Sequence, residues 1–364
     1  MIYFLVPAAH DILIKDYLAV YGAPVRPDFQ VLHYEDLAGL NEFGRGTYVL
    51  AALDHLSPQL ARLLLEIYRQ LSANDGVRFL NHPQATLHRF ELLIELNRLG
   101  RNEFRAVRAS GDLTGLRFPV FLRHERLHEG ALSTLLKSDR EICQAIGRAL
   151  IQGHKLRDLL LVEFCDTRDE AGFYRKYAAF TVGDRVIARS LNYGRSWMLK
   201  HTATEFSLPM VLEELDYVSQ NPHEQQLAEI FKLARVEYGR IDYAIKDAKV
   251  QTWEINLNPT IGRGLRPRTK EIAPELDAIR REVKRCFYER FERAWKEVQA
   301  SAAGPPVSIR IDPDTVSAAT VNTLQQNQIL NGMRSVVRPA KRLIEPLSSP
   351  FLEVLGRWAR RSGK

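Results

Sequence analysis

Cysteine is scarce in this chain of 364 residues. It has three cysteines, Cys143, Cys165 and Cys286, which lie far apart and form no Cys-x-x-Cys pair. An odd number of widely spaced cysteines argues against a disulfide framework and is typical of a protein from a reducing compartment.

Long apolar segments are absent as well. No run approaches the roughly 18 residues that a membrane span needs. The opening sequence MIYFLVPAAHDILIKDY has no basic region before its short apolar run, and Asp11 and Lys15 interrupt the apolar residues after that run. It therefore predicts a first β-strand instead of a signal peptide, and we expect a cytoplasmic protein.

Two nucleotide-binding fingerprints are also missing. The chain contains neither a Gly-x-Gly-x-x-Gly motif nor a Gly-x-x-x-x-Gly-Lys-Ser/Thr motif. The first marks the dinucleotide site of Rossmann folds, and the second marks the phosphate loop of P-loop proteins. The sequence predicts neither of those two classes.

What the chain does contain is an ordinary globular composition with an uneven charge. Hydrophobic residues make up 45% and charged residues 26%, which is enough apolar material for a sizeable core. The net charge is +7, but residues 331–364 carry eight basic and two acidic side chains, so the remainder of the chain is close to neutral. The high isoelectric point therefore describes a tail, and we expect no nucleic-acid partner for the body of the chain.

Polar residues mark one hairpin-like segment, YGRIDYAIKDAKVQTWEINLNPTIG at residues 238–262. Glu254, Asn256 and Asn258 occupy alternate positions of the second strand, so they share one face while apolar residues take the other. Asp242 in the first strand lies opposite Glu254 on that face only if the loop has three residues, or if a β-bulge compensates for a two-residue loop. Two carboxylates and an amide oxygen form a hard-oxygen site that suits Mg²⁺, with Mn²⁺ as the alternative. The competing interpretation is a solvated sheet face with a chance Glu-x-Asn.

This hairpin resembles the C-terminal metal-binding hairpin of the ATP-grasp enzymes, in which an Asp on one strand and Glu-x-Asn on the next hold Mg²⁺ beneath a nucleotide. Further segments occur in that family's order: FLNHPQATLHRFELLIEL, RFPVFLRHERLHEG, LLLVEFCD and YRKYAAFTVGDRVIARS. The resemblance covers roughly residues 1–265. It implies an α/β (α+β) fold in which ATP lies between two lobes, preceded by a small N-terminal α/β domain.

The resemblance also implies site residues and a division of the chain. The implied residues are Asp242, Glu254 and Asn256 for the metal; Arg89 and Arg123 for the triphosphate; Glu163, Phe164 and Cys165 for adenine; Glu170 or its neighbour Asp169 for ribose; and Arg175 and Arg189 for the phosphates and substrate during catalysis. The implied parts are an N-terminal domain at 1–82, an ATP-grasp domain at 83–300 with lobes at 83–155 and 156–300, a linker at 301–333 and a basic amphipathic tail at 334–364.

Two departures from the family pattern concern the phosphate contacts. Arg89 and Arg123 stand where the family usually has Lys, and Arg keeps its charge and can hold a phosphate through two hydrogen bonds. The covering loop HERLHEGALS has one glycine where many relatives have several, so its backbone has fewer ways to wrap a phosphate.

Other residues carry competing interpretations. His124 and His128 have the spacing of zinc ligands, but they lie in an expected loop and no third ligand is near them in the sequence, so ordinary surface histidines are favoured. Arg263, Arg266 and Arg268 come after the metal strand, and a solvated basic loop and a contact to an anionic substrate stay equally open.

The tail mixes basic and apolar residues. Phe351, Leu355 and Trp358, with Leu352 beside them, would share one face of a short helix. Such a segment lies on an anionic membrane, docks on an acidic partner or packs against its own protein, and the sequence leaves these three alternatives open.

The function that the resemblance implies is that of an ATP-dependent ligase. It would join an unidentified carboxylate to an unidentified amine through an acyl-phosphate, with Mg²⁺ as the metal. The alternatives are a phosphotransferase that uses the same nucleotide site, and a non-catalytic nucleotide-binding module with a membrane-binding or partner-binding tail. The oligomeric state is not predicted.

Overall fold

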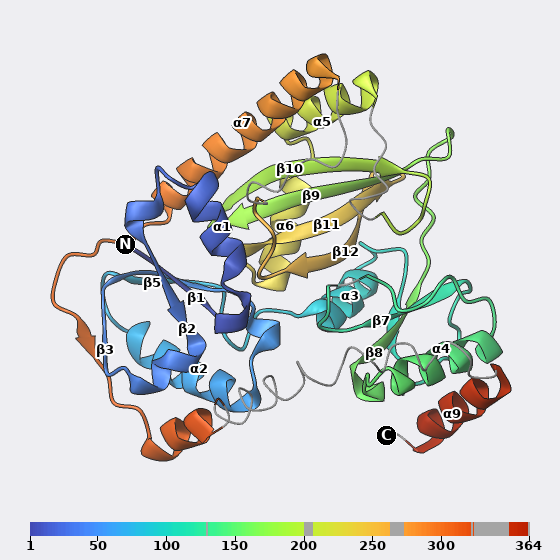
Figure 1. Ribbon diagram of the computed structural model, residues 1–364, viewed down its shortest axis with the longest axis horizontal. Helices are drawn as coiled ribbons and strands as arrows, with labels where there is room; N and C mark the ends of the chain where they lie inside the picture. The colour runs from blue at the N-terminus through green and yellow to red at the C-terminus, as the bar shows by residue number, and fades with distance from the viewer. Residues whose placement is uncertain (129, 200–206, 263–272, 322, 324–348, 363–364) are drawn as a thin grey trace.

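The structure, a computed structural model, describes residues 1–128, 130–199, 207–262, 273–321, 323 and 349–362. It confirms the predicted α/β class. Figure 1 shows an N-terminal parallel sheet, a central antiparallel sheet flanked by long helices, and a small antiparallel sheet at the opposite end of the molecule. The two larger sheets lie side by side, so the chain folds as adjoining layered units.

The N-terminal unit is a parallel sheet with helices on its faces. Its strands have the order β2-β1-β4-β5. They are β1 (Ile2–Val6), β2 (Phe29–His33), β4 (Gly46–Leu50) and β5 (Val77–Leu80), and the helices are α1 (Ile12–Val20) and α2 (Pro58–Leu71). Short 3₁₀ helices are η1 (Ala8–His10), η2 (Arg26–Asp28), η3 (Tyr34–Gly39), η4 (Leu53–His55) and, later in the chain, η5 (Leu156–Asp158).

Helix α2 forms as its sequence predicts. The Ser57 hydroxyl accepts a hydrogen bond from the Leu60 amide at 3.2 Å, and Pro58 occupies the first helical position, where its missing N–H costs nothing. The apolar stripe faces the sheet and is buried along its whole length, at Leu60, Leu63, Leu64, Ile67 and Leu71.

The segment predicted as a linker partly belongs to this N-terminal unit. Strand β13 (Val307–Ser308) pairs antiparallel with β3 (Glu42–Phe43), and Ile309 and Ala319 are buried in the same core as the sheet. Part of the described segment 301–321 therefore packs against the N-terminal unit, which corrects the expectation of a linker there.

The central sheet is antiparallel, with the order β10-β9-β11-β12. Three helices pack against strands of this sheet. The strands are β9 (Tyr174–Val182), β10 (Arg185–Gly194), β11 (Tyr238–Lys246) and β12 (Lys249–Asn256), and the helices are α5 (Leu208–Gln220), α6 (Glu224–Ala234) and α7 (Pro274–Glu297).

The small sheet has the antiparallel order β6-β8-β7. Its elements are β6 (Ala106–Arg108), β7 (Val120–His124) and β8 (Leu159–Glu163), with α3 (Arg89–Arg98) and α4 (Asp139–Ile151) beside them. Helix α3 ends as predicted, at a glycine with a left-handed backbone, because Gly100 has a φ of +67°.

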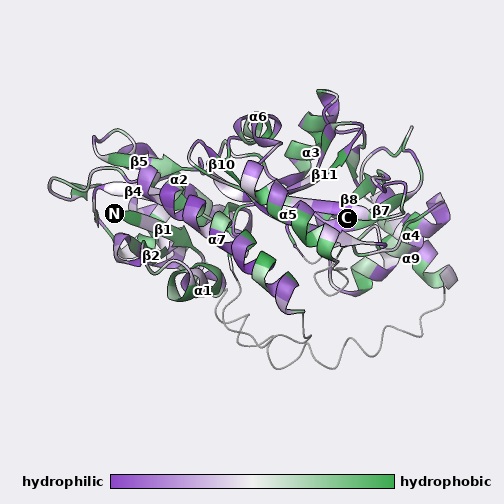
Figure 2. Cartoon of the chain, turned by 90° about the horizontal axis from the view of Figure 1, so that it is seen from above, coloured by the Kyte–Doolittle hydropathy of each residue, from purple (hydrophilic) through white to green (hydrophobic). Residues whose placement is uncertain are grey.

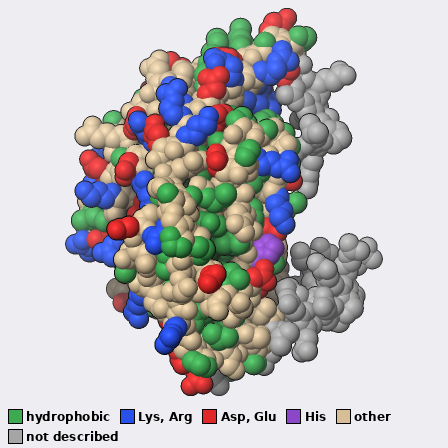
Figure 3. Space-filling model, turned by 90° about the vertical axis from the view of Figure 1, so that its left-hand side faces the viewer, with side chains coloured by type: hydrophobic (Ala, Val, Ile, Leu, Met, Phe, Trp, Pro, Cys, Tyr) green, Lys and Arg blue, Asp and Glu red, His purple; other side chains and the backbone are tan. Residues whose placement is uncertain are grey.

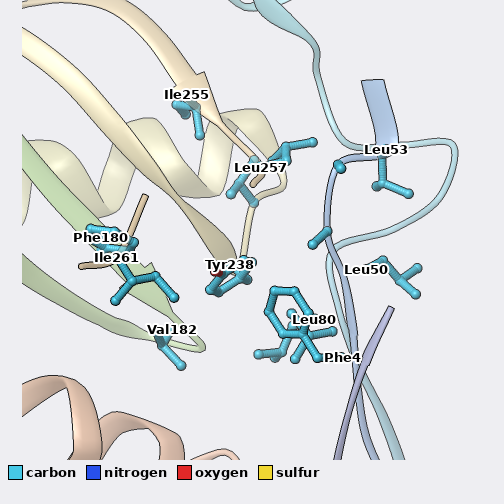
Figure 4. Packing of buried hydrophobic residues seen from close by; sticks show 14 of the residues in the cluster. Phe4, Leu50, Leu53, Leu80, Phe180, Val182, Tyr238, Ile255, Leu257 and Ile261 are labelled. Atoms are coloured by element: carbon cyan, nitrogen blue, oxygen red, sulfur yellow. The ribbon is translucent and has the colours of Figure 1, made fainter. Parts of the chain in front are cut away.

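The N-terminal and central sheets share one hydrophobic core. Tyr238 of β11 meets Phe4 of β1 edge to face, with ring centroids 5.3 Å apart, as Figure 4 shows from close by. Asn81 fastens the same junction: its buried side chain donates to the carbonyls of Leu50 and Tyr238 at 3.0 and 2.8 Å and accepts from the Glu237 amide. These contacts place the end of β4 beside the start of β11.

The described part of the tail is a helix, α9 (Ser349–Ser362), which lies along α4 (Figures 1 and 2). Its buried stripe is Leu352, Gly356 and Ala359, whereas Phe351 and Trp358 are exposed. The expected face of Phe351, Leu355, Trp358 and Leu352 is thus divided, with Leu352 turned inward. Of the three alternatives, packing on its own protein holds for this segment, and membrane or partner contact by the outward face stays a prediction.

Two glycines permit this close approach, and they supply a test of it. A Cβ on Gly356 would overlap the backbone carbonyl of Cys143, and a Cβ on Gly147 would overlap that of Leu352. We expect Gly356→Val to separate α9 from α4 and to lower the free energy of unfolding by about 1–3 kcal/mol, the usual range for overpacking. Thermal unfolding measures the loss, and faster thiol labelling of Cys143 reports the separation. Arg357→Val places the same side chain on the exposed face and should change neither.

The surface shows no one-sided charge on the face drawn in Figure 3, where basic and acidic side chains are interspersed. Among the described residues, no helix combines the length and the apolar content needed to cross a membrane.

Candidate active site

The hairpin β11–β12 brings the predicted metal ligands together through a β-bulge. Its loop has two residues, Asp247 and Ala248, both with positive φ. A two-residue loop alone would turn Asp242 to the core face, but the pairing shifts between Tyr243 and Asp242, so that Asp242 pairs with Glu254. Of the two routes that the sequence left open, the structure has the compensating bulge.

The bulged strand pair presents four polar residues to one cleft. Asp242 faces Glu254 and, one step along the same face, Arg240 pairs with Asn256. All four line a cavity of about 460 Å³, a volume typical of a small-molecule site. The convergence of Asp242, Glu254 and Asn256 is therefore a feature of the fold, and their role as metal ligands stays a prediction.

Asp242 is buried among cations. Its side chain is 2% exposed, with Lys176 Nζ 2.6 Å from Oδ2 and Arg240 Nε 2.9 Å from Oδ1. Burial opposes ionisation of this carboxyl, but Arg240 and Lys176 outweigh it and hold its pKa below the ordinary value. The group is therefore a carboxylate at neutral pH.

Glu254 lies in a second set of cations. Arg123 Nη2 is 2.9 Å from Oε2, Arg89 contacts the same oxygen, and His128 Nδ1 is 3.5 Å away. Burial opposes ionisation, yet Arg89 and Arg123 lower the pKa of Glu254 well below its usual range. Burial and the neighbouring Arg89 also lower the pKa of Arg123 to about 10, so both partners are charged at neutral pH.

The charge balance of this face is positive. Two carboxylates, Asp242 and Glu254, meet four cationic side chains, which are Arg89, Arg123, Lys176 and Arg240. A buried surplus of positive charge favours a polyanionic ligand, because charge-assisted hydrogen bonds to phosphate oxygens can replace those to the carboxylates.

The donor set fits Mg²⁺ under one condition. Asp242 and Glu254 offer carboxylate oxygens, and Asn256 Oδ1 accepts the Asn258 amide at 2.9 Å with one of its two lone pairs. The carboxylates are paired with cations, so an ion can take their place only if those cations acquire other acceptors. Phosphate oxygens are such acceptors, so these residues fit a metal that arrives together with a polyphosphate.

The cleft also has an apolar part. Phe121 and Trp197 pack with ring centroids 5.0 Å apart, and Phe164 meets Trp197 edge to face at 6.1 Å. Together with Trp253 and Cys165 they line the same cavity as the charged residues. A planar heterocycle would find stacking partners there.

The predicted site residues divide into two groups. Six of the side chains predicted for nucleotide, metal or substrate contacts line the cavity beside Glu254, namely Arg123, Phe164, Cys165, Arg175, Asp242 and Asn256. Within the described part of the chain, Arg89, Glu163, Glu170 and Arg189 are not among the lining residues. Arg263, Arg266 and Arg268 lie outside the described residues.

Glu163 has a structural environment that its sequence context does not reveal. Its side chain is 1% exposed and accepts hydrogen bonds from the backbone amides of Arg105 and Arg117 at 3.0 and 2.9 Å. The guanidinium groups of both arginines also pair with it. Glu163 holds the end of β8 to the segments that contain Arg105 and Arg117. Its side chain could contact a nucleotide only if these pairs were broken.

Arg189 and Glu170 likewise do not line the cavity. Arg189 is the bulged residue between Ala188 and Ser190, and its guanidinium lies 4.5 Å from the Phe287 ring and donates to the Ile261 carbonyl. Glu170 is exposed at a turn before β9. In these two cases the structure does not place the side chain at the cavity, where the family resemblance implied it would be.

Among the lining residues that sequence reasoning did not assign to this site are His128, Lys176, Trp197 and Arg240. Arg240 precedes Asp242 by two positions and therefore shares its face, a period-2 signal that was available. Trp197 comes after the end of β10, and no local sequence pattern predicts the orientation of its side chain.

Cys165 is expected to be unreactive although it borders the cleft. Burial raises the pKa of its thiol to about 11. At pH 7.5 the thiolate fraction is then roughly 300-fold lower than for an unperturbed cysteine of pKa about 8.5. Alkylation of the folded protein followed by peptide mass spectrometry should leave Cys165 unmodified, and unfolding in urea should restore labelling. Rapid labelling before unfolding would contradict this environment.

Neither a protein-family model nor a curated protein matches the chain. Solved structures of similar fold include the D-alanine–D-alanine ligases from Bacillus anthracis, complexed with ATP, and from Coxiella burnetii, with 11% and 12% sequence identity and TM-scores of 0.42 and 0.44. They cover 81% and 82% of this chain and 98% and 97% of their own chains. An L-amino acid ligase from Bacillus licheniformis has 10% identity and a TM-score of 0.37, over 70% of this chain and 66% of its own. Each similarity is one of fold, at low sequence identity.

Proposed function

We propose that the chain is an ATP-dependent ligase that joins a carboxylate to an amine through an acyl-phosphate. The observation that carries the proposal is the convergence of Asp242, Glu254 and Asn256 on a face with surplus positive charge, next to an aromatic part of the same cavity. The resemblance of the hairpin and the preceding segments to ATP-grasp enzymes supplies the reaction class.

The charged residues would act by exchanging partners. When ATP enters, Arg123, Lys176 and Arg240 bind phosphate oxygens in place of the carboxylates that they hold in this structure. Asp242, Glu254 and Asn256 would then hold Mg²⁺, which when bound neutralises charge on the transferred phosphoryl group.

Positioning makes up the rest of the chemistry. The aromatic residues that line the cavity, Phe121, Phe164, Trp197 and Trp253, would hold the adenine ring. A substrate carboxylate attacks the γ-phosphate, ADP leaves, and an amine then displaces phosphate from the acyl-phosphate. The protein contributes no nucleophile, and Arg175 at the cavity wall would stabilise the phosphate oxygens or the substrate.

Hydroxylamine provides a test that does not require knowledge of the amine. Because it intercepts acyl-phosphates, purified protein with MgATP and pooled carboxylic acids or amino acids should yield a hydroxamate together with ADP. Mass spectrometry of the hydroxamate would identify the acid. ATP binding without release of ADP or phosphate in any pool would overturn the proposal, and a phosphorylated product without free phosphate would assign a phosphotransferase instead.

A further inference from the structure

Outside the hairpin, three side chains form a cluster with the composition of a transition-metal site. Asp54 and His55 end the 3₁₀ helix η4, directly after β4, and His128 lies in the loop after β7. One ligand atom from each lies within 4.8 Å of the others. The two partners of His128 thus come from the N-terminal unit, and His124 is not part of the cluster. We propose that Asp54, His55 and His128 bind one zinc-like divalent ion.

The two separations that involve Asp54 are close to those of tetrahedral coordination. Asp54 Oδ2 is 3.3 Å from His128 Nε2 and 3.8 Å from His55 Nε2. Metal–ligand bonds of about 2.0–2.2 Å at tetrahedral angles place ligand atoms about 3.3–3.6 Å apart. The first pair is already at that separation, and the second needs a movement of a few tenths of an ångström.

The surroundings hold the ligands in place. Arg89, which is buried at the start of α3, donates to the carbonyls of His124, Glu125 and Leu127 at 2.8, 2.7 and 2.9 Å. These hydrogen bonds therefore hold the loop that carries His128 in place without a metal ion. Because the loop is already ordered, the assembly of the metal site costs less conformational entropy.

His128 also has the outer partner that metal-bound histidines usually have. Its Nδ1 lies 3.5 Å from Glu254 Oε2, so a ring that binds an ion through Nε2 can direct its Nδ1–H to that carboxylate. Arg89 Nη2, which lies 3.1 Å from the same nitrogen, would then keep its contact with Glu254 alone. On the other side, His10 packs on His55 with ring centroids 4.4 Å apart, which restricts the orientation of that ligand.

The donor atoms select the kind of ion. Two imidazole nitrogens and one carboxylate suit Zn²⁺ and its first-row neighbours, whereas Mg²⁺ prefers an all-oxygen site such as the one on the hairpin. Three protein ligands leave a fourth position for water or substrate. The ion would join the N-terminal unit to the loop beside Glu254. This inference does not rest on the proposed ligase function, because ion binding can be measured without ATP.

Cobalt provides the decisive probe because its visible absorption reports coordination. We expect metal-free protein without a histidine tag to bind one Co²⁺ per chain with a tetrahedral spectrum, to exchange it for Zn²⁺, and to retain it in excess Mg²⁺. His55→Ala and Asp54→Asn should each weaken Zn²⁺ binding at least about 100-fold, more than the loss of an outer partner alone.

Controls separate this cluster from other histidines and from the hairpin. His33→Ala removes a different histidine that pairs with an aspartate, Asp11, at 2.9 Å and should leave binding intact. Asp242→Asn should leave it intact too. Circular dichroism establishes that each variant is folded, and the two ligand variants provide independent tests. No stoichiometric Co²⁺ or Zn²⁺ binding, or equal binding by folded His55→Ala and Asp54→Asn, would overturn the proposal.

Discussion

Replacing Asp242 by asparagine is expected to lower ATP turnover about 10²–10³-fold, the size of effect seen when one preorganised electrostatic group is removed from a reacting centre. Asp242 is the most enclosed carboxylate of the hairpin, at 2% exposure, and two cations keep it ionised. Asparagine keeps the shape and one oxygen but removes the charge. The concentration of Mg²⁺ that supports half-maximal turnover should therefore also rise.

A matched control lies on the same hairpin. Asp247→Asn makes the same chemical change in the exposed loop, where Asn also tolerates the positive φ of that position. Turnover of this variant should equal that of the native protein. Measurements of ADP release at several Mg²⁺ concentrations, with thermal unfolding as a check on folding, complete the comparison. If Asp242→Asn is folded and retains turnover within threefold, Asp242 does not hold the metal that the reaction uses.

Local patterns predicted those parts of the fold whose partners are close in sequence. Helix α2 is predicted by its cap and its apolar stripe, and the hairpin by alternation, which required either a three-residue loop or a compensating bulge. In both cases the interacting residues lie within one element or one turn. Their geometry is set by backbone periods that the sequence displays directly.

Contacts between segments that are distant in the sequence determine side-chain positions that the local patterns did not predict. Arg89 begins a predicted helix, yet its guanidinium is buried against loop carbonyls 35 to 38 residues away. Arg189 lies on a predicted strand, yet a bulge redirects it. His128 meets Asp54 across 74 residues. Such contacts depend on which elements pack together, so a single sequence does not display them.

The tail illustrates the same limit. Its apolar residues predicted a helix with one face formed by Phe351, Leu355 and Trp358, but the buried face is centred on Gly356. Glycine contributes almost no apolar surface, so a hydrophobic pattern does not predict that it lies on the buried face of a helix. Here its small size is what permits contact with the backbone of α4.

Glu254→Gln is expected to lower the free energy of unfolding by about 3–5 kcal/mol, which is the usual cost when one partner of a buried ion pair is removed. Arg89 and Arg123, whose side chains are 3% and 9% exposed, would be left as buried cations without a neutralising carboxylate. Metal-free ATP should therefore stabilise this variant more than it stabilises the native protein, since phosphate oxygens replace the lost carboxylate. Chemical denaturation with and without ATP in EDTA measures both effects.

The exposed pair of Glu297 and Arg185 provides the control for that measurement. Glu297 binds the guanidinium at 2.6 and 3.1 Å, but both side chains are open to solvent, so Glu297→Gln should change stability little. It should also leave the response to ATP unchanged. If Glu254→Gln is as stable as the native protein, the two arginines do not depend on this carboxylate. If the variant is less stable but gains nothing extra from metal-free ATP, Arg123 does not bind the triphosphate, and the charge exchange proposed for this residue is wrong.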